Sequence, residues 1–226
     1  MSRHAHANVT RVAELRGRKS HTRVVLDGSN QYGAPQMLVL FYEDESVFSN
    51  FHAADFKASS VEDKEMVISF CCSEQYFMYR KAKLVGDERI AAAILSATDP
   101  MTMKMLGRKL AMSKEMLKLW SSKSRDAMYR GCLEKFSQNR HHRLFLFRTH
   151  GMRLVEASAN DAIWGIGLDK FDKRAENVAT WLGTNWLGEC LDTVREELWN
   201  DPRFGEEREQ VEGESLEHRC ALLINF

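Results

Sequence analysis

Apolar residues form short continuous runs at several places along the chain. Met37 to Tyr42 is such a run, and its length predicts a buried strand. Residues 55–60 and 65–71 flank a polar segment and predict the two arms of a hairpin. Residues 144–147 and 153–156 have the same strand-like character. The pattern therefore predicts a small sheet or hairpin, not a fold dominated by sheet.

Helical periodicity covers most of the remaining chain. Asp99-Pro100 combines a capping residue with Pro at the first helical position, which predicts a helix that ends at Leu106-Gly107. Apolar residues recur every three or four positions from Ser113 to Phe136 and predict one long helix or two abutting ones. Further helices are predicted over residues 73–85, 87–97 and 185–199. We expect a mainly α fold of the α+β kind, in which a single compact multihelical domain carries a small sheet.

The two ends of the chain differ from its middle. Residues 1–36 are polar, basic and aperiodic, so we interpret them as a disordered arm, although a mitochondrial transit peptide has a similar charge pattern. Residues 37–200 carry the periodic pattern and form the predicted domain. Beyond Pro202 the chain turns acidic and polar, which predicts a tail over residues 201–226.

Composition narrows the classes of function. Formal net charge is zero, so no bulk attraction toward nucleic acid or an anionic membrane is expected, and any such contact must be local. The five Cys residues have neither zinc spacing nor a C-x-x-C pair, and we predict no metal and no cofactor. No apolar run approaches the roughly 18 residues of a membrane span. These features predict an intracellular protein, cytoplasmic or nuclear.

The helix predicted over residues 73–85 carries two charges on its apolar side. At about 100° per residue, Glu74 and Lys81 share one face with Phe77 and Met78. The two charges are about 10 Å apart along the axis, which is too far for an ordinary i,i+4 pair. That spacing suits two groups that reach one ligand from different turns. A buried ion pair, or a Lys that extends its ammonium to water, would explain the same pattern.

Two more helical segments carry candidate chemistry, and each also has a structural explanation. Arg108 and Lys109 follow Gly107, and an arginine fork suits a phosphate. The same cations suit the negative C-terminal end of a helix. Trp120 can stack on a base, although most Trp residues at helical spacing lie in the core.

A glycine-containing segment over residues 159–167 predicts a loop with polar chemistry. Asp161 lies in this loop near Trp164, and Glu156 precedes it. These carboxylates suit acid–base work or contact with ribose hydroxyls. The alternative is an Asx turn at Asn160-Asp161, in which the side chain only holds the loop.

Taken together and in order, these segments resemble the NADAR family (NAD- and ADP-ribose-associated, also called YbiA-like). The resemblance extends from about Leu38 to Leu198. Its motifs are Phe48-Ser-Asn-Phe, Ser73-Glu-x-Tyr-Phe with Lys81-Ala, Pro100 with Leu-Gly-Arg108, Trp120-x4-Arg-x2-Met, Lys135-Phe, Leu-Val-Glu156-Ala-Ser, Asp161-x-Ile-Trp-Gly-Ile-Gly, Trp181-x-Gly-x-Asn and Leu187-Gly.

The resemblance implies a mostly helical YbiA-like domain that hydrolyses N-glycosidic bonds. Family substrates are ADP-ribose attached to guanine and early intermediates of the riboflavin pathway. The expected partner is an ADP-ribosylated nucleic acid or nucleotide, with no membrane; the oligomeric state stays open, and a monomer fits. The alternatives are a glycosidase of ribosylamino-pyrimidine phosphates and an inactive module that only binds ADP-ribose or NAD.

The resemblance also assigns roles to residues. Lys81 would attack C1 of the opened sugar and form a transient imine, which requires a neutral amine; Arg80 and the apolar neighbours of Lys81 would lower its pKa. The implied catalytic residues are Glu74, Lys81 and Asp161. The implied substrate-binding residues are Phe48, Asn50, Tyr76, Arg108, Trp120 and Trp164.

The chain departs from the family pattern in places. Gln75 stands where His is common, Ala159 replaces a frequent Pro, and His150 interrupts the usual Thr-Gly. These changes leave the implied chemistry intact and leave the choice of substrate open.

Overall fold

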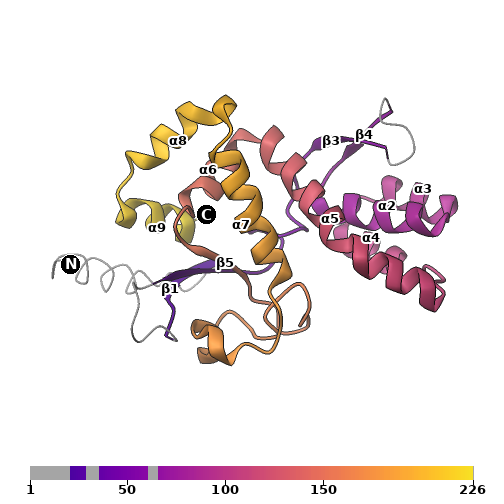
Figure 1. Ribbon diagram of the computed structural model, residues 1–226, viewed down its shortest axis with the longest axis horizontal. Coiled ribbons are helices and arrows are strands. Elements are labelled where there is room, and N and C mark those ends of the chain that lie inside the picture. The colour runs from indigo at the N-terminus through magenta and orange to yellow at the C-terminus, as the bar shows by residue number, and fades with distance from the viewer. Residues whose placement is uncertain (1–20, 29–35, 61–65, 226) are drawn as a thin grey trace. The chain divides into compact units, whose positions relative to one another are not determined.

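The computed structural model describes residues 21–28, 36–60 and 66–225 and divides the chain into two units (Figure 1). Residues 1–49 and 141–226 make up unit 1, and residues 50–140 make up unit 2. Each unit has its own helices and its own small sheet.

Unit 1 contains a three-stranded sheet. The strands are β1 (Thr22–Leu26), β2 (Met37–Phe41) and β5 (Arg153–Glu156), in the order β1-β2-β5. The middle strand pairs antiparallel with β1 and parallel with β5. Leu38 to Phe41 are completely buried, as a continuous apolar run requires when both faces of a strand are covered. The predicted strands at 37–42 and 153–156 are therefore confirmed.

β1 lies inside the segment predicted to be a disordered arm, so that prediction was wrong for this part of it. Arg23 on β1 donates to the backbone carbonyl of Lys170 and forms an ion pair with Glu176 at 2.9 Å. These partners lie about 150 residues further along the chain, which a reading of local periodicity does not detect. Residues 1–20 and 29–35 of the predicted arm lie outside the described residues.

The run at residues 144–147 was also predicted wrongly. It belongs to helix α6 (Arg140–Arg148), and all four of its residues are buried. A four-residue apolar run buried on all sides has no period that separates a strand from a helix. Downstream, unit 1 contains the short 3-10 helices η1 (Lys173–Glu176) and η2 (Val178–Thr180), and then α7 (Trp186–Trp199), which confirms the predicted helix at 185–199.

The predicted acidic tail is folded. It forms the 3-10 helix η3 (Pro202–Phe204) and the helices α8 (Gly205–Glu212) and α9 (Leu216–Asn225). α9 contacts β1, and Cys220 and Leu223 are buried. Two acids of this segment pair with buried arginines of α6, in Arg143–Glu207 and Arg148–Glu214. The acidic composition that suggested a tail therefore reflects ion pairs that hold the segment down.

Unit 2 begins with the predicted hairpin, β3 (Phe56–Ser59) and β4 (Val67–Phe70), which pair antiparallel. Four helices follow: α2 (Ser73–Val85), α3 (Glu88–Ser96), α4 (Pro100–Arg108) and α5 (Lys114–Gln138). Asp87, Asp99 and Ser113 cap the last three through their side chains. Ser73 begins α2 but does not cap it, because Cys72 occupies the cap position. Gly86 ends α2 in the left-handed conformation, with φ 79°.

Helix α2 is central to unit 2. It contacts α3, α4, α5 and β4 (Figure 1). It is consequently buried on several sides and not along one stripe only: Tyr76 and Tyr79 are as buried as Phe77 and Met78. With its helices and two small sheets, the chain confirms the predicted α+β class. Within the described residues, no helix combines the length and apolar character that crossing a bilayer requires.

Candidate active site

Of the two charges predicted on the apolar side of α2, one is buried in unit 2 and the other is half-buried. Glu74 is 5% exposed, in the first turn of the helix, where the positive end of the helix dipole favours a carboxylate. Lys81 is half-buried two turns later. An ionised group in such surroundings is costly unless its environment compensates it, so the pair marks an unusual site on this helix.

The environment of Lys81 favours a neutral amine. Its Nζ donates to the backbone carbonyl of Gly107 at 3.0 Å. Burial lowers the pKa of Lys81, and the positive charge of Arg108 lowers it further, while the carboxylate of Glu74 opposes both. The predicted contribution of Arg80 is not found: that guanidinium donates to the hydroxyl of Tyr76 at 2.6 Å.

Close packing of α4 on α2 brings Gly107 to the lysine. Gly107 lies inside α4 and does not cap it, because the helix continues through Arg108. A Cβ at position 107 would lie 2.2 Å from the sulfur of Met78, so any other residue here would force the Met78 side chain to move. The same contact brings the positive charge of Arg108, at the end of α4, close enough to Lys81 to lower the pKa of that lysine.

Trp120 completes this group from α5. Its ring packs against Phe77 of α2 with centroids 5.0 Å apart and an interplanar angle of 51°. Trp120 stays half-buried, whereas Phe77 is buried. Unit 2 therefore brings together Glu74, Lys81, Arg108 and Trp120 around one face of α2.

Asn50 and Gln75 hold the first turn of α2. The carbonyl of Asn50 accepts from the backbone N–H of Glu74 at 3.0 Å, and its side-chain amide contacts Met128 of α5. The amide of Gln75 donates to the carbonyls of Ile94, Leu95 and Ala97 at 3.1 to 3.2 Å. Its oxygen accepts from the backbone of Cys71 at 2.9 Å. Gln75 thus fastens the residue next to Glu74 to the end of α3, a role the sequence did not reveal.

Two predicted substrate-binding residues are core residues instead. Tyr76 is 2% exposed and packs on Phe70 with centroids 5.1 Å apart. A Cβ at Gly131 would lie 2.7 Å from the Tyr76 ring, so α5 closes directly over it. Phe48, in unit 1, is 1% exposed and packs on Phe41 at 5.5 Å. Side chains this buried fill the interior and offer no surface to a ligand.

The loop of residues 159–167 lies in unit 1 and is held by its own polar groups. One carboxylate oxygen of Asp161 accepts from the backbone N–H groups of Ile163 and Trp164 at 2.9 and 2.8 Å. This is the Asx-type turn that the sequence offered as the alternative. Trp164 is half-buried and meets Trp186 edge to face at 5.8 Å. Asp161 therefore holds the loop, whatever else it does.

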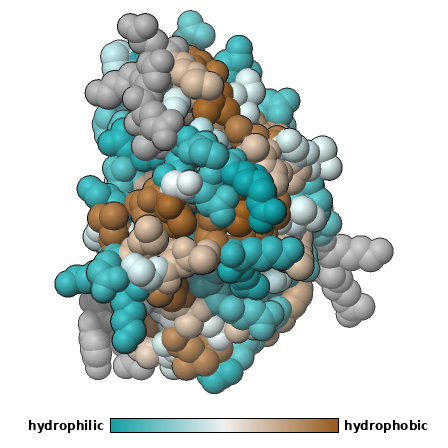
Figure 2. Space-filling model, turned by 90° about the vertical axis from the view of Figure 1, so that its right-hand side faces the viewer, coloured by the Kyte–Doolittle hydropathy of each residue, from teal (hydrophilic) through white to brown (hydrophobic). Residues whose placement is uncertain are grey.

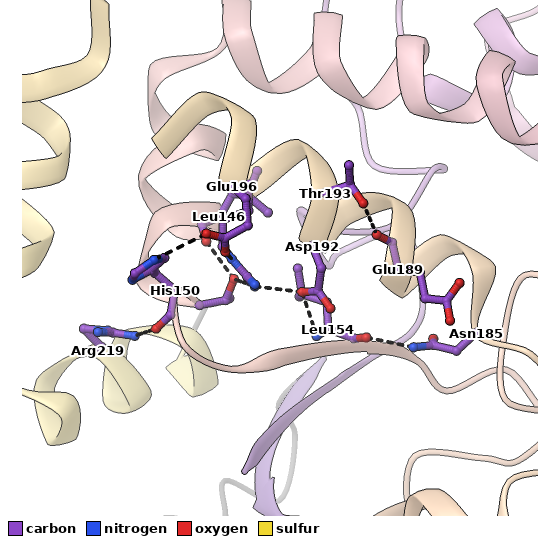
Figure 3. Close-up of polar contacts among 11 residues, drawn as sticks. Leu146, His150, Leu154, Asn185, Glu189, Asp192, Thr193, Glu196 and Arg219 are labelled. Carbon is purple, nitrogen blue, oxygen red and sulfur yellow. Dashed lines mark hydrogen bonds and ion pairs between the residues drawn. The ribbon is translucent and has the colours of Figure 1, made fainter. Parts of the chain in front are cut away.

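Polar side chains of α7 hold β5 and the chain before it (Figure 3). Asn185 donates to the carbonyl of Leu154 at 2.9 Å, and the N–H of Leu154 donates to Asp192 at 3.2 Å. Burial raises the pKa of Asp192 to about 6, although Arg195 binds this carboxylate at 2.7 Å. This network has the paired donors and acceptors of a structural support.

Two further sets of titratable side chains are relevant to metal binding or acid–base chemistry. In the described part of the chain, His21, Glu43 and Glu45 are the acids and imidazole close enough to share a metal ion. The ammonium of Lys170 already binds the same Glu43 oxygen as His21, at 3.1 Å, so a lysine occupies one of the oxygens that an ion would need. In unit 2, Lys135 is 1% exposed, and burial lowers its pKa to about 8. The sequence showed Lys135 only as part of a motif.

Comparison with known proteins places these residues in a family. The NADAR domain model matches residues 40–199. Protein irg-1 of Caenorhabditis elegans is 57% identical over 213 residues, which cover 91% of this chain and 99% of that protein. N-glycosidase R617 of Acanthamoeba polyphaga mimivirus is 33% identical over 67% of this chain and 86% of the viral protein.

The bacterial relatives include a solved structure. N-glycosidase YbiA of Escherichia coli (strain K12) is 31% identical over 74% of this chain and 92% of the bacterial protein. The NMR structure of E. coli YbiA has a TM-score of 0.54 with 28% identity, over 71% of this chain and 84% of that chain. These relatives support N-glycosidase activity in general. The family model spans most of the residues that form both units, and the chain belongs to the NADAR domain family.

Proposed function

We propose that this protein is an N-glycosidase that removes ADP-ribose from guanine, in nucleic acid or in nucleotides. The observation that carries the proposal is Lys81, a half-buried amine whose pKa is lowered and which lies on the same helix as the buried carboxylate of Glu74. A purely structural helix has little reason to keep both groups among apolar residues. Relatives named N-glycosidases support the class of reaction.

The chemistry follows from these two groups. Cleavage of an N-glycosidic bond develops positive charge at C1 of the sugar, and a nearby carboxylate stabilises such charge. The neutral amine of Lys81 attacks C1, and the C1–nitrogen bond to the base breaks. A proton from the amine passes to the departing base nitrogen, with Glu74 as the shuttle. The bond between C1 and the ring oxygen then breaks as the nitrogen of Lys81 forms a double bond to C1, and the second amine proton passes to the ring oxygen, which gives the imine of the opened sugar. Water then hydrolyses the imine, which frees the sugar and restores the lysine.

The remaining roles follow from position. Arg108 is exposed and cationic beside Lys81, which suits the diphosphate of ADP-ribose. Trp120 presents a half-buried ring that suits stacking on a base. The roles of Asp161 and Trp164 in unit 1 stay proposals that rest on the family resemblance. An Asp161→Asn variant separates catalysis from loop support, because the amide oxygen can still accept the two backbone bonds.

The test combines turnover with trapping. The protein is incubated with an oligonucleotide that carries ADP-ribosylated guanine, and released ADP-ribose is measured by mass spectrometry. Borohydride is added to reduce the imine to a stable adduct. Lys81→Ala should abolish both signals. Lys83→Ala is the matched control, because that lysine lies on the same helix and pairs with Glu88 at 2.6 Å. An adduct that persists in Lys81→Ala would reject the lysine assignment.

A substrate panel separates this proposal from its alternatives. Ribosylamino-pyrimidine phosphates of the riboflavin pathway are assayed in parallel by the release of ribose phosphate. Turnover of these compounds alone would replace the ADP-ribosyl substrate while keeping the reaction type. Calorimetry that shows tight ADP-ribose binding without turnover of either substrate would reject the enzyme and favour a reader of ADP-ribose.

A further inference from the structure

Positive charge is concentrated in one part of a chain that is neutral overall. Residues 100–125 contain seven Lys or Arg side chains and a single acid, Glu115, whereas the whole chain has a formal net charge of zero. Most of this segment is α4 and the first half of α5. Such local excess produces a positive surface potential that the net charge conceals.

Most of these seven cations are exposed and have no acidic partner among the described residues. Arg108, Lys109, Lys114 and Lys118 are all exposed, and none of them forms an ion pair with the residues that the structure describes. About two to three turns after Lys118 the situation changes, because Arg130 binds Asp126 at 2.9 Å. The excess charge therefore ends where α5 enters the core of unit 2.

The cations on α5 follow one side of the helix. Lys114, Lys118 and Arg125 are spaced by four and seven residues, which places them within about 40° of one another around the axis. They span about 16 Å, a length that accommodates several phosphates at about 3.4 Å of duplex axis per phosphate of one strand. Arg108 and Lys109 lie at the end of α4, within six residues of Lys114 along the chain.

This row of charge begins at the candidate active site. Arg108 follows the glycine whose carbonyl binds Lys81, and it lowers the pKa of that lysine. Trp120, which packs on Phe77 of α2, lies two positions after Lys118 and so points to nearly the opposite side of α5 from these cations. A polyanion that follows the row to Arg108 would therefore lie beside Lys81, and Arg108 is the link between the row and the candidate site.

We propose that Arg108, Lys109, Lys114, Lys118 and Arg125 form a basic surface that binds the sugar-phosphate backbone of a nucleic acid. The substrate is then a modified base within a polymer and not a free nucleotide. The second statement rests on the proposed N-glycosidase function, whereas the first does not. Sequence-independent phosphate contacts by exposed lysines and arginines are how proteins position nucleic acid before a base is read.

The exposed apolar residues of α5 do not form the single face that a membrane-bound helix needs. Leu117 and Leu119 on α5 are exposed, but they lie two positions apart and so point to nearly opposite sides of the helix. A helix that lies on a bilayer needs its apolar residues on one face. On the face drawn in Figure 2, hydrophobic patches alternate with bands of hydrophilic residues.

The test compares two variants with the same change in charge. Lys114→Gln/Lys118→Gln removes two cations of the basic surface. Lys57→Gln/Arg89→Gln removes two other exposed cations of unit 2 and serves as the control. Binding of an unmodified, labelled 20-nucleotide single strand is measured by fluorescence anisotropy between 50 and 200 mM salt. The slope of log K against log salt should shrink by about 1.4 in the first variant and stay unchanged in the control.

Turnover provides the second readout. The ratio of kcat/KM on an ADP-ribosylated oligonucleotide to that on ADP-ribosylated guanosine monophosphate should fall about tenfold in Lys114→Gln/Lys118→Gln and stay constant in the control. Equal binding by both variants, or wild-type binding to phosphatidylserine vesicles but not to oligonucleotides, would overturn the basic surface. If the wild type cleaves neither substrate, the proposed function fails, while the anisotropy measurement still decides the surface.

Discussion

The two units handle buried charge in different ways. In unit 1, buried arginines bind carboxylates through paired hydrogen bonds: Arg143 contacts Glu207 at 2.6 and 2.8 Å, and Arg148 contacts Glu214 through the same fork geometry. In unit 2, the half-buried Lys81 donates to a backbone carbonyl and has a like charge, Arg108, nearby. The first arrangement fixes a fold, whereas the second lowers the pKa of an amine.

This contrast teaches how to separate structural charges from chemical ones. A guanidinium that donates two hydrogen bonds to one carboxylate stays charged, and its position is fixed. An amine that is desolvated without a carboxylate hydrogen bond can lose its proton, which a nucleophile requires. The same distinction holds on the surface, where Lys114 and Lys118 have no ion pair among the described residues, in contrast to exposed pairs such as Arg203–Asp201 in unit 1.

The largest expected effect is on the stability of unit 1. Glu207→Ala leaves Arg143 buried without this carboxylate, and we expect the free energy of unfolding to fall by about 3–5 kcal/mol. Asp126→Ala removes an exposed i,i+4 partner of Arg130 in unit 2 and should cost about 0.5 kcal/mol or less. Urea denaturation of both variants measures the difference.

A rescue experiment sharpens the same point. The double variant Arg143→Met/Glu207→Leu removes both charges together and should recover much of the loss, because no buried charge remains unpaired. Similar stabilities for Glu207→Ala and Asp126→Ala would show that the ion pairs of unit 1 are not what holds the C-terminal helices.

Ion pairs such as Arg143–Glu207 also explain which parts of the fold could and could not be predicted from the sequence. Helices α3, α4 and α5 follow from local signals, since Asp87, Asp99 and Ser113 each cap the helix that they precede. Helices α8 and α9 could not be predicted this way, because Glu207 and Glu214 appear as surface acids until their partners on α6 are known. Strand β1 was missed for the same reason.

The candidate site was predictable to a similar degree. Glu74 and Lys81 were found because helical periodicity places them on an apolar face. Tyr76 and Phe48 were predicted as binding residues because a motif shows which residue types occur together but not which of them are buried. Gln75 gave no signal, because its four hydrogen bonds go to backbone groups that lie up to 22 residues away.

Lys135 allows a test of buried charge within unit 2. Its pKa is about 8 in the folded protein and about 10.4 for a free lysine, so the unfolded state binds more protons between these values. Stability should therefore rise as pH increases from about 8 to about 10.4, by about 3 kcal/mol in total, and the penalty is fully present below pH 8. Lys135→Met should lack this rise when stability is measured by urea denaturation across the range.

The matched comparison for that experiment is Lys83→Met. Lys83 is paired with Glu88, so its removal should leave the alkaline rise of the wild type in place. A rise of equal size in Lys135→Met would show that another group titrates in this window and would remove Lys135 from the account.

A Gln75 variant tests whether the uncharged hydrogen bonds that hold α2 contribute as much to stability as the ion pairs of unit 1. Gln75→Ala leaves the backbone N–H of Cys71 and the end of α3 without their partner, and we expect a loss of about 2 kcal/mol. Because Glu74 is the adjacent residue, kcat should fall together with stability. Lys81→Met should instead remove activity while stability is maintained, and parallel losses in both variants would contradict the distinction drawn here.

The smallest expected effect is a shift in the pH dependence of turnover, and it addresses the difference between the units directly. If the neutral form of Lys81 attacks the sugar, kcat/KM rises with pH through the pKa of that lysine. Arg108 lowers this pKa, so Arg108→Gln should raise it and move the rising limb to higher pH. Arg108→Lys keeps the positive charge and should leave the limb in place, even if the substrate phosphates are bound less well. Lys109→Gln removes the neighbouring charge and controls for a general change in surface potential. A limb that moves equally in Arg108→Gln and Lys109→Gln would mean that surface potential, and not a like charge held beside the amine, sets the reactivity of Lys81.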